Sequence, residues 1–178
     1  MIVQRLESRL HGVINLDELA HHCRVPNETE FLVELQRFAD AAVREAEDMG
    51  QLALLFQAVR VTLDAWPKGK TFRLPIGPLL DADGLSVTGA GESFDGFTIF
   101  TGEKPSLRLT GAAPRGPVEI EYIAGYAEAP DELPADLRQA LMDQAACYFD
   151  ARGAVDQKTA ATSPHFARII GRKRGVRL

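Results

Sequence analysis

Residues 118–152 constrain the fold more than any other part of the chain, because they join a clear strand to a clear helix. Apolar and acidic residues alternate over residues 118–122, so this strand buries one face and exposes the face that carries Glu119 and Glu121. Pro130 and Pro134 then bracket the place where a helix begins. An apolar stripe follows at three- and four-residue steps: Leu137, Ala140, Leu141, Ala145, Tyr148 and Phe149. The stretch therefore predicts a half-buried strand and an amphipathic helix that packs on another element.

Two further helices are predicted before residue 51. Asn15 begins the first, with Glu18 three residues later as in a capping box, and Asn27 repeats that cap for the second. The second helix has an apolar stripe: Phe31, Leu35, Phe38, Ala42, Ala46 and Met49. Residues 1–14 form a mixed lead whose apolar spacing permits one or two helical turns. We assign residues 1–50 to the N-terminal helices of a helical core.

The middle of the chain has the pattern of strands. A long alternating run over residues 51–66 is followed by short strands between glycine and proline turns, at residues 72–74, 85–88, 97–100, 107–110 and 118–122. The run at 51–66 is longer than a typical strand, so we expect a bulge or a bend in it. We predict an α+β fold, in which an antiparallel β region (51–128) is inserted into a helical bundle core (1–50 and 129–153).

Charge is distributed unevenly. The whole chain carries −5, but from Ala154 onward six basic residues stand against one acidic residue, which gives +5 and leaves −10 for the rest. Residues 154–178 are polar and contain few apolar side chains, so we predict an extended basic tail. No run of eighteen apolar residues is present, which predicts a soluble protein with no membrane partner, made in the cytoplasm.

The patterns of catalytic and metal sites are weak here. His21, His22 and Cys23 are consecutive, and consecutive helical residues point about 100° apart, so they do not converge on one ion. The serines of the β region lie in hairpins, away from the strand-to-helix elbow that activates a nucleophile. We predict no enzyme, no catalytic residue, no metal and no cofactor.

Four stretches together resemble one family. They are the short helix at residues 16–25, the long helix at 31–50, the sequence Leu63-Asp64-Ala65-Trp66-Pro67 followed by Leu74-Pro75, and residues 118–152. In this order they resemble the head-tail connector (adaptor) proteins of long-tailed phages and phage-like gene transfer agents. The resemblance implies a structural virion protein without catalysis. It also implies a ring, typically a dodecamer, between the portal protein and a stopper or tail-completion protein, with DNA passing through without sequence-specific binding.

The tail is the candidate portal-binding site, a hypothesis that no family motif supplies. Its residues would be Phe166, Arg168, Ile169, Ile170, Arg172, Lys173, Arg174 and Arg177. The apolar residues would anchor in a groove and the basic residues would pair with acidic portal residues. The alternative is a small nucleic-acid-binding regulator with a basic C-terminal arm. The acidic body argues against it, because phosphates would be repelled everywhere except at the tail.

Overall fold

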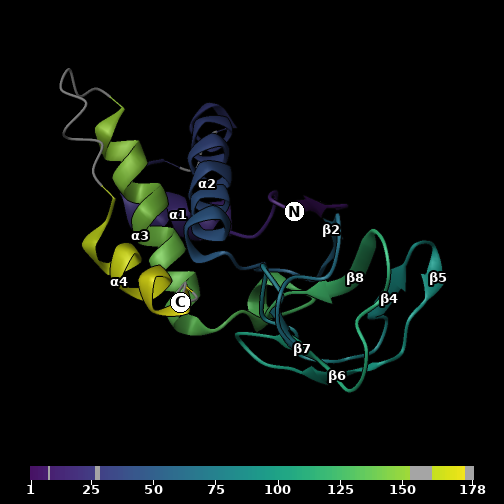
Figure 1. The fold of residues 1–178 in the computed structure, drawn as a ribbon. Coiled ribbons are helices and arrows are strands. Elements are labelled where there is room, and N and C mark those ends of the chain that lie inside the picture. The colour runs from purple at the N-terminus through teal and green to yellow at the C-terminus, as the bar shows by residue number, and fades with distance from the viewer. Residues whose placement is uncertain (8, 27–28, 153–161, 175–178) are drawn as a thin grey trace. The chain divides into compact units, whose positions relative to one another are not determined.

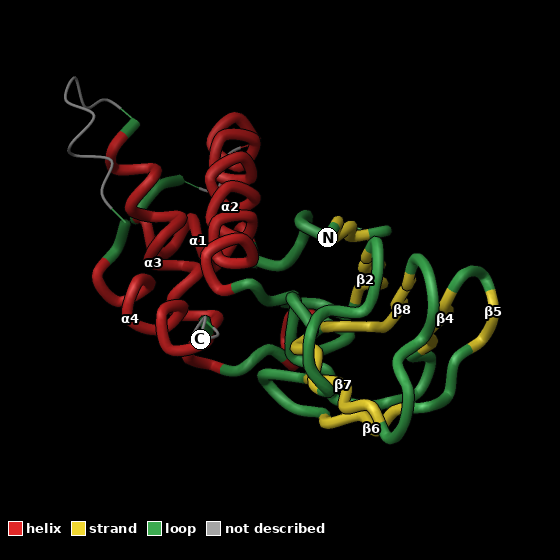
Figure 2. Tube along the Cα trace, viewed as in Figure 1, coloured by secondary structure: helices red, strands yellow, loops and turns green. Residues whose placement is uncertain are grey.

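A computed structural model of the chain describes residues 1–7, 9–26, 29–152 and 162–174. The chain forms two compact units, one from Met1–Ser8 with Leu55–Tyr126 and one from Arg9–Leu54 with Ala127–Leu178. The first unit is made of strands and loops and the second of helices (Figures 1 and 2). The predicted α+β class is therefore confirmed.

The helical unit contains α1 (Leu16–Cys23), α2 (Thr29–Gly50), α3 (Ala135–Ala151) and α4 (Pro164–Lys173), with a short 3₁₀ helix η1 (Pro130–Glu132) before α3. Asn15 caps α1, because its side-chain oxygen accepts hydrogen bonds from the backbone N–H groups of Asp17 and Glu18 at 2.9 and 3.2 Å. The predicted start at Asn15 is thus confirmed. The cap predicted at Asn27 lies outside the described residues.

Helices α2 and α3 pack along most of the two stripes that the sequence indicated, although Met49, the last residue of the α2 stripe, is 37% exposed. Small residues of α2 (Ala39, Ala42 and Ala46, all at most 2% exposed) let α3 approach closely, and Leu137 and Leu141 of α3 are fully buried. At one end the rings of Phe38 and Phe149 meet edge to face, with centroids 6.2 Å apart. This seam forms the core of the helical unit.

The strand unit contains a five-stranded antiparallel sheet in the order β1-β2-β8-β4-β5. The strands are β1 (Ile2–Arg5), β2 (Gln57–Leu63), β8 (Val118–Ala124), β4 (Ser86–Gly89) and β5 (Glu92–Ser93). The helical turns that the spacing in residues 1–14 permitted are absent from the start of the chain, because residues 2–5 pair with β2 in the register Ile2↔Thr62 to Arg5↔Val59. Pairing with a strand supplies backbone hydrogen bonds that a helix of one or two turns in water cannot keep.

β2 is shorter than the run predicted over residues 51–66. The buried carboxylate of Glu47, in the last turn of α2, accepts a hydrogen bond from the N–H of Leu54 at 3.0 Å. Gln51 has a positive φ of 51°, which turns the chain away as α2 ends. Residues 51–54 are therefore tied to the helical unit, and pairing with β8 begins only at Gln57.

A second, three-stranded antiparallel sheet has the order β3-β7-β6, from Thr71–Arg73, Ser106–Leu109 and Phe97–Phe100. Its apolar side is buried, with Leu107 fully covered. Tyr122 of β8 reaches the segment after β3, where its hydroxyl donates to the Ile76 carbonyl at 3.0 Å and accepts from the Ile76 N–H at 3.2 Å. Burial raises the pKa of this phenol well above its usual range, so Tyr122 remains a neutral structural link.

The expected extended tail is a helix over Pro164–Lys173. Ser163 precedes a proline at the first helical position, which is a favourable helix start. Phe166, Ile169 and Ile170 then fall on one side at three- and four-residue spacing, and all are buried. Three apolar residues form no core alone, but α2 and α3 cover them. The sequence of the tail by itself contains no sign of these two partners. Residues 154–161 and 175–178 of the tail lie outside the described residues.

Candidate docking site

The last helix, α4, is held in place by polar contacts from α3 as well as by burial. Gln144 of α3 is fully buried, and its side-chain oxygen accepts a hydrogen bond from the N–H of Ser163 at 2.8 Å. The Ser163 hydroxyl in turn accepts from the N–H of Phe166 at 3.5 Å and caps the helix. Gln144 therefore determines where α4 begins.

Asp143 of α3 joins three helices. One oxygen of its carboxylate lies 2.6 Å from Nδ1 of His165 in α4, and the other lies 3.5 Å from Nε2 of His22 in α1. The three side chains are partly exposed, with relative accessibilities of 24–37%. His22 thus serves a helix-to-helix contact. Within the described part of the chain, no three His, Cys, Asp or Glu side chains are placed to hold a metal ion.

The apolar residues of the candidate portal-binding site are used inside the subunit. Phe166 and Ile170 are fully buried and Ile169 is 6% exposed. The helix that carries them, α4, packs on α2 and α3, and Figure 1 shows it beside α3. A partner could reach them only after α4 had left its place. Docking that leaves the subunit folded must therefore use the other side of the helix.

The basic residues lie on that other side. Arg168, Arg172 and Arg174 are exposed, and Lys173 is half-buried. Arg168 and Arg172 are one turn apart and share a face of α4. Among the residues that the structure describes, neither has an acidic partner. Arg177 lies outside the described residues.

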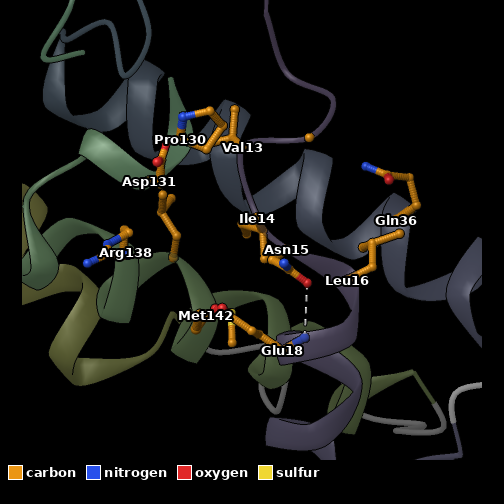
Figure 3. Close-up of a pocket in the computed structure, with 12 residues that line it drawn as sticks. Val13, Ile14, Asn15, Leu16, Glu18, Gln36, Pro130, Asp131, Arg138 and Met142 are labelled. Carbon is orange, nitrogen blue, oxygen red and sulfur yellow. Dashed lines mark hydrogen bonds between the residues drawn. The ribbon is translucent and has the colours of Figure 1, made fainter. Parts of the chain in front are cut away.

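The helical unit also contains a cavity of about 510 Å³ between α1, α2, α3 and η1. Figure 3 shows Pro130, Asp131 and Arg138 on one side of it and Leu16 and Gln36 on the other. Its described lining contains no Ser, Thr, Cys, Lys, Tyr or His, and its carboxylates are those of Glu18 and Asp131. The charged groups at its rim form no ion pair with one another among the described side chains.

The two cysteines and Tyr148 of the helical unit have raised pKa values and serve packing between helices. Burial raises the pKa of the Cys23 and Cys147 thiols, so both are poor nucleophiles near neutral pH. Both cysteines are half-buried, and no disulfide joins them. Burial, together with a 2.5 Å hydrogen bond that its hydroxyl donates to Glu45, raises the pKa of Tyr148 to about 12. Tyr148 thereby links α3 to α2.

No described helix is both long and apolar enough to cross a membrane.

The fold of the chain can now be compared with those of known proteins. No family model and no curated protein matches the chain. Solved structures do match over its full length. The neck of an empty gene transfer agent (GTA) particle, computed with C6 symmetry, contains a chain with 25% identity and a TM-score of 0.80, of which 97% is covered.

Two related structures agree. A chain in the neck of a native GTA particle, computed with C12 symmetry, has 25% identity and a TM-score of 0.77, and 97% of that chain is covered. A chain in the virion of the native GTA particle has 24% identity and a TM-score of 0.79, again with 97% covered. This chain is thus similar in fold, from end to end, to a component of a gene transfer agent neck. These neighbours point to a structural, non-enzymatic role.

Sequence reasoning missed the residues that position the site. Gln144 and Asp143 do not stand out, because an isolated polar residue in a helical pattern is usually solvated. His22 was weighed only as a metal ligand, and its contact with Asp143 was not predicted. Signals for α4 were present, namely Ser163 before Pro164 and an apolar triplet at helical spacing. The high polarity of the surrounding residues outweighed them. The order of the four family-like stretches, in contrast, pointed to the neck structures that match.

Proposed function

We propose that this chain is a head-tail connector (adaptor) subunit in the neck of a phage-like gene transfer agent particle. Copies of it form a ring, with portal protein on one side, a stopper or tail-completion protein on the other and DNA passing through the centre. One observation carries the proposal: the whole chain matches neck chains with TM-scores of 0.77–0.80. The C6 and C12 symmetries of those necks support a cyclic assembly.

The portal contact is assigned to the outer stripe of α4. Arg168 and Arg172 are exposed on one face, and Arg174 is exposed just beyond the last turn. Guanidinium groups suit bidentate pairing with carboxylates, so an acidic portal surface is the expected partner. A single exposed pair contributes about 0–1 kcal/mol, but a ring presents the stripe once per subunit and multiplies the contact.

The test reverses charge without removing α4. Truncation after Gly153 would also delete Phe166 and Ile170 from the core, and a loss of docking would then be ambiguous. The double variant Arg168→Glu/Arg172→Glu keeps the buried face intact. Its matched control, Arg37→Glu/Arg44→Glu, reverses two exposed arginines on α2 in the same unit.

Each protein is mixed with purified portal protein and examined by electron microscopy and sedimentation. Wild type and control should form rings on the portal, whereas the α4 variant should lose docking at physiological salt. Normal docking by the α4 variant would rule out the α4 contact. Failure of the wild type to form rings or to bind portal would reject the adaptor function itself. If the wild type instead binds duplex DNA in a salt-dependent way that needs Arg168 and Arg172, the nucleic-acid-binding alternative is favoured.

A further inference from the structure

The two sheets of the strand unit each bury one side and leave the other open. In the five-stranded sheet, Val61, Ile120 and Val87 stand in one cross-strand row and are at most 2% exposed. In the three-stranded sheet, Phe72 and Leu107 stand in a buried row. The strand unit is compact, so these buried sides form its interior and the open sides face away from it.

The open side of the five-stranded sheet is acidic with apolar corners. Strand pairing sets Arg60 beside Glu121, and Nε of Arg60 lies 2.6 Å from Oε1 of Glu121 and 3.6 Å from Oε1 of Glu119. One arginine faces two carboxylates, so the cluster has an excess negative charge, and Glu119 is the less engaged and more exposed acid. Ile123 is 48% exposed and Ile2 is 61% exposed at the ends of this face. We call these five residues, Ile2, Arg60, Glu119, Glu121 and Ile123, the acidic face.

The open side of the three-stranded sheet has the opposite character. The register Thr71↔Arg108↔Thr98 places Arg108 at its centre, and the next row contains Arg73 and Phe100. All five side chains are exposed, with Phe100 at 48%. The side chain of Arg108 makes no hydrogen bond or ion pair with another described residue. We call these five residues the basic face.

We propose that the acidic face of one subunit docks on the basic face of the next, and that this head-to-tail contact closes the ring. The inference rests on the proposed ring function, because a ring of three or more subunits requires two different, complementary patches on each subunit. Both patches lie on one compact unit. Glu119 meets Arg108 in this contact, and Ile123 and Phe100 supply apolar area beside the charges.

DNA is the competing occupant of the basic face. Two arginines on a small sheet could contact phosphates, and an exposed aromatic ring could stack on a base. DNA would leave the acidic face, with its exposed Ile2 and Ile123, without a partner, whereas a second copy of the chain covers both faces at once. The observations therefore favour the copy.

The experiment is a charge swap in the full-length chain. Arg108→Glu and Glu119→Lys each place like charges across the contact, and each should lower the fraction of protein in rings by about tenfold or more. The double variant Arg108→Glu/Glu119→Lys restores opposite charges at every interface and should recover rings. Lys68→Glu and Asp95→Lys, at exposed turn positions of the same unit, are the matched controls and should leave rings unchanged.

Rings are counted by native mass spectrometry and negative-stain electron microscopy, with portal protein present as a template, and circular dichroism checks folding. If both single variants form rings as well as wild type, the face-to-face contact is wrong and the adaptor function stands. Folded single variants that lose rings, combined with a double variant that does not recover them, would also overturn it. Loss of duplex DNA binding by Arg108→Glu with intact rings would assign the basic face to DNA. Absence of wild-type rings even on the portal would instead count against the adaptor function.

Discussion

Replacing Phe166 by alanine tests whether α4 belongs to the folded subunit. Phe166 is 0% exposed, so the whole ring is removed from a packed site. An aromatic side chain buries roughly 150–250 Å², which at about 25 cal/mol per Å² amounts to on the order of 4–6 kcal/mol. The alanine keeps its Cβ and the denatured chain already buries some area, so we expect a measured loss of about 3–5 kcal/mol.

The energy with which α4 docks sets an upper limit on that loss. Once the substitution exceeds this energy, α4 detaches, and the subunit behaves as one that lacks residues 164–173. Phe166→Ala should therefore cost no more than a chain truncated before Ser163. Both variants are compared by urea denaturation followed at 222 nm, and a lower m-value in the truncated chain would reflect its smaller buried surface.

Arg168→Ala is the matched control, because it lies two residues away on the exposed side of the same helix. Its stability should stay within about 0.5 kcal/mol of wild type. Hydrogen exchange gives a second measurement: amides of residues 167–173 should be protected in wild type and lose protection in Phe166→Ala. A loss below about 1 kcal/mol, or wild-type amides that exchange like those of an unfolded peptide, would show that α4 is not docked as described.

Three further changes test other parts of the fold. Leu141→Asp places an unpaired carboxylate in the α2–α3 seam, where Leu141 is fully buried, and should cost several kcal/mol and abolish cooperative thermal unfolding; a folded mutant would refute the seam. Gly125→Ala, at a φ of 155°, would bring Cβ within 2.6 Å of the Phe56 N atom and should lower the melting temperature clearly, whereas Gly111→Ala, in open space, should not. In the folded protein the pKa of Tyr148 is raised from 10.0 to about 12, so its contribution to stability is present below pH 10 and is lost as pH rises from 10 to 12. Tyr148→Phe should therefore flatten the plot of unfolding free energy against pH between pH 10 and 12. An unchanged slope would contradict the raised pKa of Tyr148.

The elements that sequence alone predicted well are those whose pattern is local. The α3 stripe and the alternation in β8 each repeat several times within one segment, and Asn15 caps its helix through groups two and three residues away. Periodicity of this kind reflects one buried face and does not depend on which partner covers it. Predictions from such segments therefore survive without any tertiary information.

The elements that were missed depend on distant partners. β1 is a strand because β2, more than fifty residues later, offers it an edge, and its own composition allows either state. α4 is a helix in the structure because Gln144 and the apolar sides of α2 and α3 meet it. In both cases the deciding free energy comes from contacts between segments, which no window of a single sequence contains.

Because Phe166, Ile169 and Ile170 are buried, the contact of α4 with the portal and the contact between neighbouring subunits should respond differently to salt. With its apolar residues used inside the subunit, α4 offers a portal protein mainly charge, and exposed charge pairs weaken as salt screens them. The sheet-to-sheet contact combines Glu119 and Arg108 with exposed apolar side chains, whose burial salt does not screen. Rising salt should thus release rings from the portal before it divides the rings into subunits. If a ring of this chain came apart at a lower salt concentration than its contact with the portal, the proposal that the acidic and basic faces form the contact between subunits would be wrong.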